Sequence, residues 1–308
     1  SIITLTASSD GTIMTGTYTV IAGNNTGQLA VSSFTITNVS DLAGNSMIST
    51  TVPTGVSNIA GTKAIVVDTT APTPFIISVT DNVLGGIANP TSGDFTNDNT
   101  PTLVITTEQG TTSALYDNGV LLASGITSGT YTITPALTDG THSLVVHSTD
   151  IAGNTGDSAA YILRVDTIAP IAVINPLVTN SITPVITGTA VHEQDSTLAI
   201  KVNGVTYTHG TSPELSWVGN DWTLTILPGA ALPGVGTYSV VATMSDVAGN
   251  IGVDITSNEL VIERTPPTIT SFTSTTPDGI VRVGSEVNIT ATASEVSLLI
   301  FTVFLFSG

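Results

Sequence analysis

The segment Ser148-Thr149-Asp150-Ile151-Ala152-Gly153-Asn154 decides the fold class, because the chain repeats it twice more. Residues 39–45 read VSDLAGN and residues 244–250 read MSDVAGN, so Asp, Ala, Gly and Asn recur at the same four positions. The second and third copies also match upstream, where Gly140 aligns with Gly236, and their turn Asp residues lie 96 residues apart. Repetition at a period of domain size indicates a tandem array of similar domains.

A second marker, Val-Asp-Thr-x-Ala-Pro, occupies residues 67–72 and 165–170. A third version at residues 262–267 reads Ile-Glu-Arg-Thr-Pro-Pro, and the three copies are 98 and 97 residues apart. Pro has no amide hydrogen to donate to a β-ladder, so each marker should end a strand and begin a linker. The predicted boundaries near residues 70, 168 and 265 give the C-terminal part of a domain at 1–70, complete domains at 71–168 and 169–265, and the N-terminal part of a domain at 266–308.

Between the markers, short runs of β-branched and apolar residues alternate with turns rich in Gly, Asn, Asp and Pro. Thr102–Thr106 is typical of such a strand. The pairs Asn118-Gly119 and Asn203-Gly204 separate apolar runs and predict tight hairpins, since both residue types tolerate positive φ. About seven short strands in a domain of about 97 residues predict an all-β chain of tandem immunoglobulin-like β-sandwich domains.

The composition argues against several classes of partner. The 308 residues include 5 Lys and Arg against 23 Asp and Glu, which gives a formal net charge of −18. Binding of nucleic acid or of anionic lipid needs clustered cations, so neither partner is expected. An acidic, oxygen-rich surface suits hard cations such as calcium, and it also serves simply to keep an extracellular protein soluble. The chain has no cysteine, so it forms no disulfide or thiolate site.

The Asp-x-Ala-Gly-Asn turn followed by the Asp-Thr-x-Ala-Pro linker resembles the bacterial immunoglobulin-like repeats of large surface adhesins and biofilm-associated proteins. The resemblance covers nearly the whole chain. It implies a structural stalk module, extracellular or at the bacterial cell surface, whose partners are neighbouring immunoglobulin-like domains or copies of itself. It also implies calcium at the joints. The third joint, Glu263-Arg264-Thr265-Pro266, departs from the pattern, which argues against a calcium site there.

Seven acidic residues are candidate calcium ligands. In the predicted site a turn carboxylate joins one at the adjacent linker, and carbonyls and water complete the roughly six to eight oxygen positions that calcium takes. The candidates are Asp41, Asp150 and Asp246 in the turns, Asp68 and Asp166 in the linkers, and Asp94 and Asp98 in the loop at residues 94–101. In the alternative interpretation, Asp and Asn bond the local backbone while Gly takes positive φ, which explains the turns without a ligand.

The two ends of the chain complement each other in pattern, because residues 266–308 look like the first half of a domain and residues 1–70 like the second half. One explanation is a longer array of repeats. The other is a self-assembling filament, in which strands of residues 266–308 complete the N-terminal half-domain of the next subunit. The candidate assembly strand consists of Leu298, Leu299, Ile300, Phe301, Val303, Phe304, Leu305 and Phe306. This run is too short to cross a bilayer as a helix, which needs about 20 residues.

Catalytic motifs are incomplete, so the chain is not expected to be an enzyme. His192-Glu193-Gln194-Asp195-Ser196 begins like a zinc-binding His-Glu-x-x-His motif but has Ser in place of the second His. The chain contains no Gly-x-Ser-x-Gly sequence. Trp217 and Trp222 leave open a carbohydrate-binding accessory module, since an indole ring can stack on a sugar, but packing in a core or loop is the simpler role.

Overall fold

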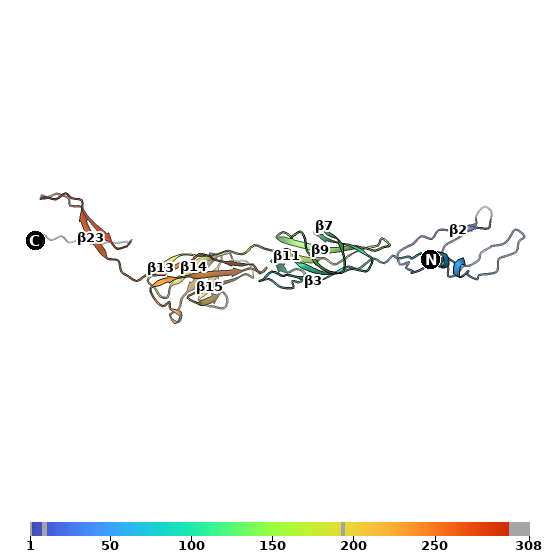
Figure 1. The fold of residues 1–308 in the computed structure, drawn as a ribbon, viewed down its shortest axis with the longest axis horizontal. Helices are drawn as coiled ribbons and strands as arrows, with labels where there is room; N and C mark the ends of the chain where they lie inside the picture. The colour runs from blue at the N-terminus through green and yellow to red at the C-terminus, as the bar shows by residue number, and fades with distance from the viewer. Residues whose placement is uncertain (1, 8–10, 192–194, 296–308) are drawn as a thin grey trace. The chain divides into compact units, whose positions relative to one another are not determined.

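The computed structural model describes residues 2–7, 11–191 and 195–295. Contacts divide the chain into two compact units: the first contains residues 1–169 together with 245–251, and the second contains residues 170–244 and 252–308. Both units are built from β-strands (Figure 1), and the helical segments are single turns: η1 (Gly55–Ser57), α1 (Ile59–Thr62) and η2 (Pro228–Ala230). None of the described helices has the length and apolar character needed to span a membrane.

The first unit contains a two-sheet sandwich over residues 75–165, as the sequence predicts. One sheet has the strand order β3 (Phe75–Thr80), β5 (Thr102–Thr106), β8 (Gly129–Thr132). The other has the order β4 (Phe95–Thr96), β11 (Tyr161–Val165), β9 (Gly140–Thr149), β6 (Thr112–Asp117), β7 (Val120–Ile126), with β10 (Thr155–Asp157) also paired to β9. These pairs are antiparallel except for β4 with β11, which is parallel.

The core of this sandwich follows the two-residue period of its strands, because successive side chains of a strand point to opposite faces of the sheet. In β9 every second residue from His142 to Ser148 is buried, and the residues between them are partly exposed. Leu115, Leu144 and Leu163 come from three adjacent strands and are fully buried. The hairpin predicted at Asn118-Gly119 is confirmed, because both residues take positive φ, 50° and 79°, between β6 and β7.

The second unit repeats the two-sheet architecture over residues 172–262. One sheet has the order β12 (Ala172–Ile174), β14 (Val185–Ala190), β18 (Asp221–Thr225), β17 (Leu215–Val218). The opposite side is formed by β13 (Leu177–Thr179), β22 (Leu260–Ile262), β19 (Gly236–Tyr238), and by β16 (Val205–Thr208), β15 (Thr197–Val202), β20 (Val240–Ser245), β21 (Ile251–Val253). The turn between β20 and β21 lies in the segment 245–251, which belongs to the first unit.

Both Trp residues lie inside the second sandwich. Trp222 is fully buried and Trp217 is 4% exposed, and they join a core with Leu198 and Ile200. Gly188 makes room for them, since a Cβ at this position would lie 2.3 Å from the Trp222 ring. The indole rings are therefore core residues, and neither is available to stack on a sugar.

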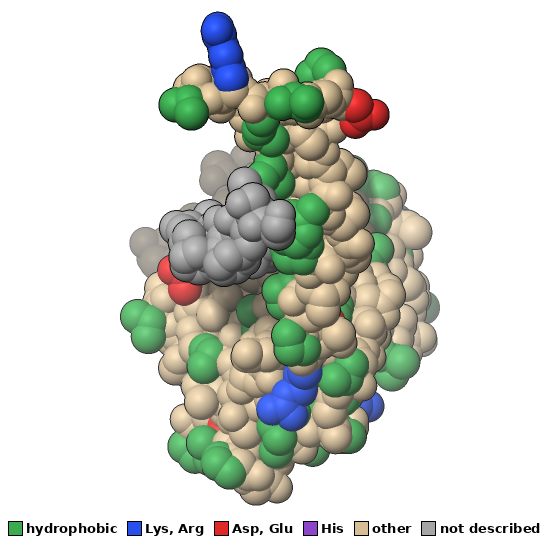
Figure 2. Space-filling view, turned by 90° about the vertical axis from the view of Figure 1, so that its left-hand side faces the viewer, with side chains coloured by type: hydrophobic (Ala, Val, Ile, Leu, Met, Phe, Trp, Pro, Cys, Tyr) green, Lys and Arg blue, Asp and Glu red, His purple; other side chains and the backbone are tan. Residues whose placement is uncertain are grey.

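The terminal segments contrast with the two sandwiches. Residues 2–66 contain the short pair β1 (Thr6–Ala7) and β2 (Met14–Thr15), residues 266–295 contain β23 (Ile269–Ser274) and β24 (Ile289–Ala293), and no described side chain of either segment is buried. On the face shown in Figure 2, hydrophobic side chains are scattered over the described surface among few charged ones. The assembly strand predicted at residues 298–306 lies outside the described residues.

Candidate metal site and linker contacts

The three Asp-x-Ala-Gly-Asn turns share one geometry, in which the Asp carboxylate closes its own turn. In the second turn, Asp150 Oδ1 accepts a hydrogen bond from the Asn154 amide N–H at 2.8 Å and Asp150 Oδ2 accepts one from Asn154 Nδ2 at 2.8 Å. The carboxylates of Asp41 and Asp246 accept the same two bonds at 2.8–2.9 Å. The Gly residues of the turns take positive φ of 87°, 92° and 97°. Local turn chemistry therefore accounts for the motif.

These hydrogen bonds stabilise the ionised form of the carboxyl groups of Asp150 and Asp41. The side-chain amide of Asn154 lowers the pKa of the Asp150 carboxyl below its ordinary value, and the Asn45 amide does the same for the pKa of Asp41. Hydrogen bonds to the charged form of a carboxyl favour that form. The hydrogen bonds therefore favour the charged form of Asp41 and Asp150.

The linker aspartates use their carboxylates within the linker. Asp68 Oδ1 accepts the Thr70 amide at 2.9 Å, and Asp166 Oδ1 accepts the Ile168 amide at 3.0 Å. The linker Asp contacts the turn through its main-chain carbonyl and not through its carboxylate. This carbonyl accepts a hydrogen bond from the side-chain amide of the turn Asn. In the described part of the chain, no three His, Asp or Glu side chains gather to hold a metal.

The two candidate residues of the 94–101 loop lie in different surroundings. Asp94 accepts the amide and the hydroxyl of Thr91, both at 2.7 Å, and this hydroxyl lowers the pKa of the Asp94 carboxyl. Asp98 is 1% exposed and accepts the Asn82 amide at 3.1 Å and the Thr100 amide at 2.8 Å. Asp94 thus serves a surface turn, whereas Asp98 is a buried carboxylate.

Two residues near Asp98 escaped the sequence analysis. Asp81, directly after β3, is 4% exposed and accepts the Val83 amide and the Thr96 hydroxyl at 2.8 and 2.6 Å. Asn97 is 8% exposed, and its buried Oδ1 has no hydrogen-bond partner. The sequence offered a partial signal, because Asn97 lies in the oxygen-rich loop already identified, but nothing linked this loop to the end of β3.

Three oxygen atoms of this region lie close to Gly86. A Cβ built on Gly86 would lie 2.7 Å from Asp81 Oδ2, 2.8 Å from the Ala248 carbonyl oxygen and 2.9 Å from Asn97 Oδ1. All four residues belong to the first unit. Gly86 does not have a positive φ, so the close approach of oxygen atoms is what requires glycine here. We name Asp81, Gly86, Asn97 and Ala248 the oxygen cradle. Carboxylate, amide and carbonyl oxygens are the ligands that calcium takes.

The charge of the oxygen cradle is uncompensated by nearby cations. Ion pairs among the described residues join His142 to Asp117 and His147 to Asp157, and none involves Asp81 or Asp98. Carboxylates taken out of water are normally paired with a cation or bound to a metal, because desolvation of the charge is costly. Two buried carboxylates beside an unpaired amide oxygen therefore make a favourable place for a hard cation.

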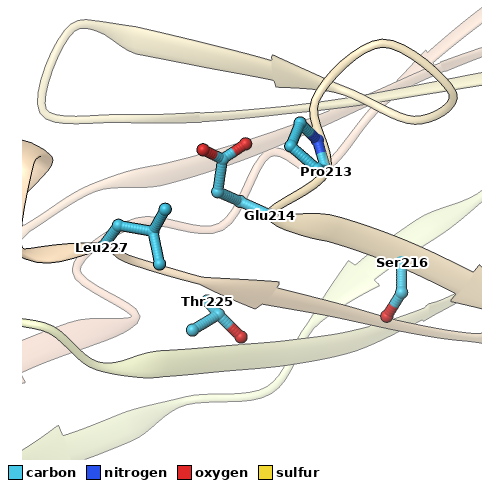
Figure 3. Close-up of a pocket in the computed structure, with 5 residues that line it drawn as sticks. All are labelled: Pro213, Glu214, Ser216, Thr225 and Leu227. Carbon is cyan, nitrogen blue, oxygen red and sulfur yellow. The ribbon is translucent and has the colours of Figure 1, made fainter.

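One surface hollow of the described residues, of about 380 Å³, is lined by Tyr116, Asn118, Gly119, Ser143, Val145, His147 and Asp157. In it His147 Nδ1 lies 2.6 Å from Asp157 Oδ1. Another hollow, of about 250 Å³, is lined by Pro213, Glu214, Ser216, Thr225 and Leu227, whose side chains Figure 3 shows on and beside β17 and β18. Glu214 is the one ionisable residue among these five. Residues 192–194 of the incomplete zinc motif lie outside the described residues.

Comparison with known proteins agrees with this architecture. Residues 72–167 match the family model of the bacterial Ig-like domain. No curated protein matches the chain. Among solved structures, the fibronectin(III)-like modules of Clostridium thermocellum CbhA share 16% identity with a TM-score of 0.31, and the match covers 57% of this chain and 90% of that one.

Two further solved structures belong to multidomain proteins. Immunoglobulin domains 1–5 of Sidekick-1 match with 15% identity and a TM-score of 0.37 over 64% of this chain and 41% of that chain. A structure from a 1.5-MDa bacterial ice-binding adhesin matches with 20% identity and a TM-score of 0.28 over 60% of this chain and 62% of that one. At these identities the likeness concerns the fold alone.

The fold class and the family match agree with each other. The described chain is built mainly of β-strands, with two successive sandwiches, and the first of them matches the bacterial Ig-like domain. Bacterial Ig-like domains are typically non-catalytic and typically found at the cell surface or outside the cell. The match to the bacterial Ig-like domain family therefore holds for residues 72–167.

Proposed function

We propose that the chain is a structural, extracellular module that forms part of a stalk or surface fibre of a bacterial adhesin-type protein. The observation that carries the proposal is repetition: two sandwiches with separate cores, over residues 76–165 and 172–262, follow one another through proline-containing linkers. Successive domains with separate cores can act as a mechanical spacer, a role that needs no catalytic or ligand-binding site. Neighbouring immunoglobulin-like domains are the expected partners.

Calcium bound in the oxygen cradle stiffens this module. Asp81 supplies a carboxylate, Asn97 its unpaired amide oxygen and Ala248 a carbonyl, and the buried carboxylate of Asp98 adds negative charge nearby. Ala248 belongs to an Asp-x-Ala-Gly-Asn turn, so an ion at this place would tie that turn to the end of β3 and to the loop after β4. Water would complete the coordination sphere, as is usual for calcium.

Calcium titration of the full chain tests this site. A ligand at about 100 times its Kd stabilises the native state by about 2.7 kcal/mol, which raises the melting temperature of such a domain by on the order of 10 °C. We expect calcium to produce such a shift, EDTA to reverse it, and D81N to abolish it. N97D adds a charged ligand and should strengthen calcium binding. D94N alters an exposed turn outside the cradle and is the matched control.

The outcome separates the two parts of the proposal. If calcium and EDTA leave the melting temperature of the parent unchanged, calcium plays no part, and the stalk role still stands on the repeated domains. If D94N removes the shift as completely as D81N does, calcium binds at the surface turn and the oxygen cradle is the wrong site.

The alternative is a filament whose subunits join by strand donation. The specific observation in its favour is that β23 and β24 pair in a way similar to β3 and β5. Both pairs are antiparallel, and both contain a register shift near the start of the first strand, between Ile76 and Ser78 in one and between Ile269 and Ser271 in the other. Residues 266–295 thus have the form of the first two strands of a sandwich, without a described side chain that is buried. Another copy of residues 1–70 could cover them.

A further inference from the structure

In the linkers at residues 67–72 and 165–170, one Thr donates two hydrogen bonds to a side-chain oxygen of the preceding segment. We call this pair of hydrogen bonds the upstream grip. Asn25 Oδ1 accepts the amide and the hydroxyl of Thr69 at 2.7 and 3.1 Å. Asp139 Oδ1 accepts the same two groups of Thr167, both at 2.9 Å. Two different residues thus hold the same linker position by the same pair of bonds.

The other side of each linker is held by the turn of the domain that follows. Asn154 Nδ2 donates to the Asp68 carbonyl at 3.2 Å, and Asn250 Nδ2 donates to the Asp166 carbonyl at 2.8 Å. The same amide nitrogen also donates to the Asp of its own turn, at 2.8 and 2.9 Å. An –NH₂ group has two hydrogens, so one Asn joins turn and linker at once.

A glycine two residues after each of these Asn residues lets the linker approach. A Cβ on Gly156 would lie 1.9 Å from the Pro72 carbonyl oxygen, and a Cβ on Gly252 would lie 1.6 Å from that of Pro170. Neither glycine has a positive φ, so space and not backbone conformation requires glycine. The turn motif therefore extends to Asp-x-Ala-Gly-Asn-x-Gly wherever it receives a linker.

In the third linker, at residues 262–267, neither the donor nor the acceptor of the upstream grip is present. The sheet pairing aligns the two domains, because Val165 faces Gly140 as Ile262 faces Gly236. In this register Arg264 stands where Thr167 does, and Val235 stands where Asp139 does. The donor and the acceptor are replaced together, which leaves residue 264 without this hydrogen-bond pair.

We propose that the two grips form a metal-free clasp that orders the linkers at 67–72 and 165–170, and that the linker at 262–267, which lacks the upstream grip, is the most mobile of the three. Asn25, Asp139, Asn154 and Asn250 are the positioning residues of the clasp. The inference deepens the proposed stalk function, because it assigns stiffness to the first two joints and bending to the third.

Backbone ¹⁵N relaxation of the full chain, recorded in EDTA, tests the clasp. Order parameters are about 0.85 for rigid backbone and below about 0.6 for flexible backbone. We expect Thr69 and Thr167 near the rigid value and Arg264 well below it. D139A should lower the order parameter of Thr167, and G252A should lower those of the linker by pushing Pro170 away. D157A removes another surface carboxylate of the same domain, bonded to His147, and is the matched control.

A gain of order is the converse test. V235D combined with R264T installs both partners of the grip at the third linker, and residue 264 should then become as ordered as Thr167. Equal order at Thr167 and Arg264 in the parent, or an order parameter of Thr167 that D139A leaves unchanged, would overturn the clasp. Because the buffer contains EDTA, this result is independent of calcium, and it does not depend on where the protein resides. Asp139 is exposed, so D139A is expected to fold, and the dispersion of the amide resonances of residues 75–165 checks this.

Discussion

At the scale of single residues, close approach of neighbouring atoms explains several glycines whose backbone conformation does not require glycine. Gly86, Gly188 and Gly252 all lack a positive φ, and each would place a Cβ within 3 Å of another atom. One faces the oxygen cradle, one faces an indole ring and one faces a linker carbonyl. These three glycines therefore mark points where another group of the structure approaches the backbone closely.

Gly188→Ala should destabilise the second sandwich. The new methyl would lie 2.1 Å from the Val173 carbonyl oxygen and 2.3 Å from the Trp222 ring, both in a closed core. Overpacking of this kind costs about 1–3 kcal/mol of the free energy of unfolding. Urea denaturation followed by Trp fluorescence measures it. Gly229→Ala, where the Cβ would meet nothing within 4 Å, is the control and should change stability by less than about 0.5 kcal/mol.

At the scale of elements, turns carry most of the local information. The Asn-Gly hairpins at 118–119 and 203–204 take the positive φ values that the residue types predict. The Asp-x-Ala-Gly-Asn turns close on their own Asp in all three copies, although the segments around the first copy contain no buried side chain before Val67. Such turns form by local hydrogen bonding and do not need a core to define them.

The turn around Asp150 should weaken in acid. Since its folded pKa lies below the ordinary value, the carboxylate contributes stability that is fully present above the unfolded pKa of about 3.9 and is lost as the pH falls through the folded pKa. We expect ¹³C-detected NMR to give a carboxyl titration midpoint for Asp150 below about 3.9. The N154A variant should move that midpoint upward. A midpoint that N154A leaves in place would show that the amide is not the cause.

At the scale of the whole chain, two consecutive segments with cores are flanked by two described segments without one. The sandwiches bury residues from Ile76 to Val165 and from Ala172 to Ile262, whereas the described residues of 2–66 and 266–295 bury none. Exposed apolar side chains such as Ile280 and Val283 therefore lack a described partner in the second of these segments. A further part of the same protein or another copy of the chain would cover them.

The filament alternative predicts that the purified chain assembles. Burying the apolar side chains of 266–295 against residues 1–70 of another copy would favour association as concentration rises. Analytical ultracentrifugation over a wide concentration range measures this, and F272D, which places a charge on the exposed face of β23, should prevent it. E286Q, also in the exposed 266–295 segment, is the control. A parent chain that stays monomeric throughout would rule strand donation out.

The sequence by itself determined the all-β class, the hairpins and the turns, because each of these depends on residues within a few positions of one another. It also determined the repeat register, because short motifs recur at a period of 96–98 residues. The tertiary structure alone decided which oxygens meet at Gly86, that the Trp residues are core, and that Asp139 grips Thr167. Asp81 and Asn97 are 16 positions apart, and Asn154 and Asp68 are 86 apart. Residues so far apart become neighbours only when strands pair across a sheet, and no local pattern records that pairing.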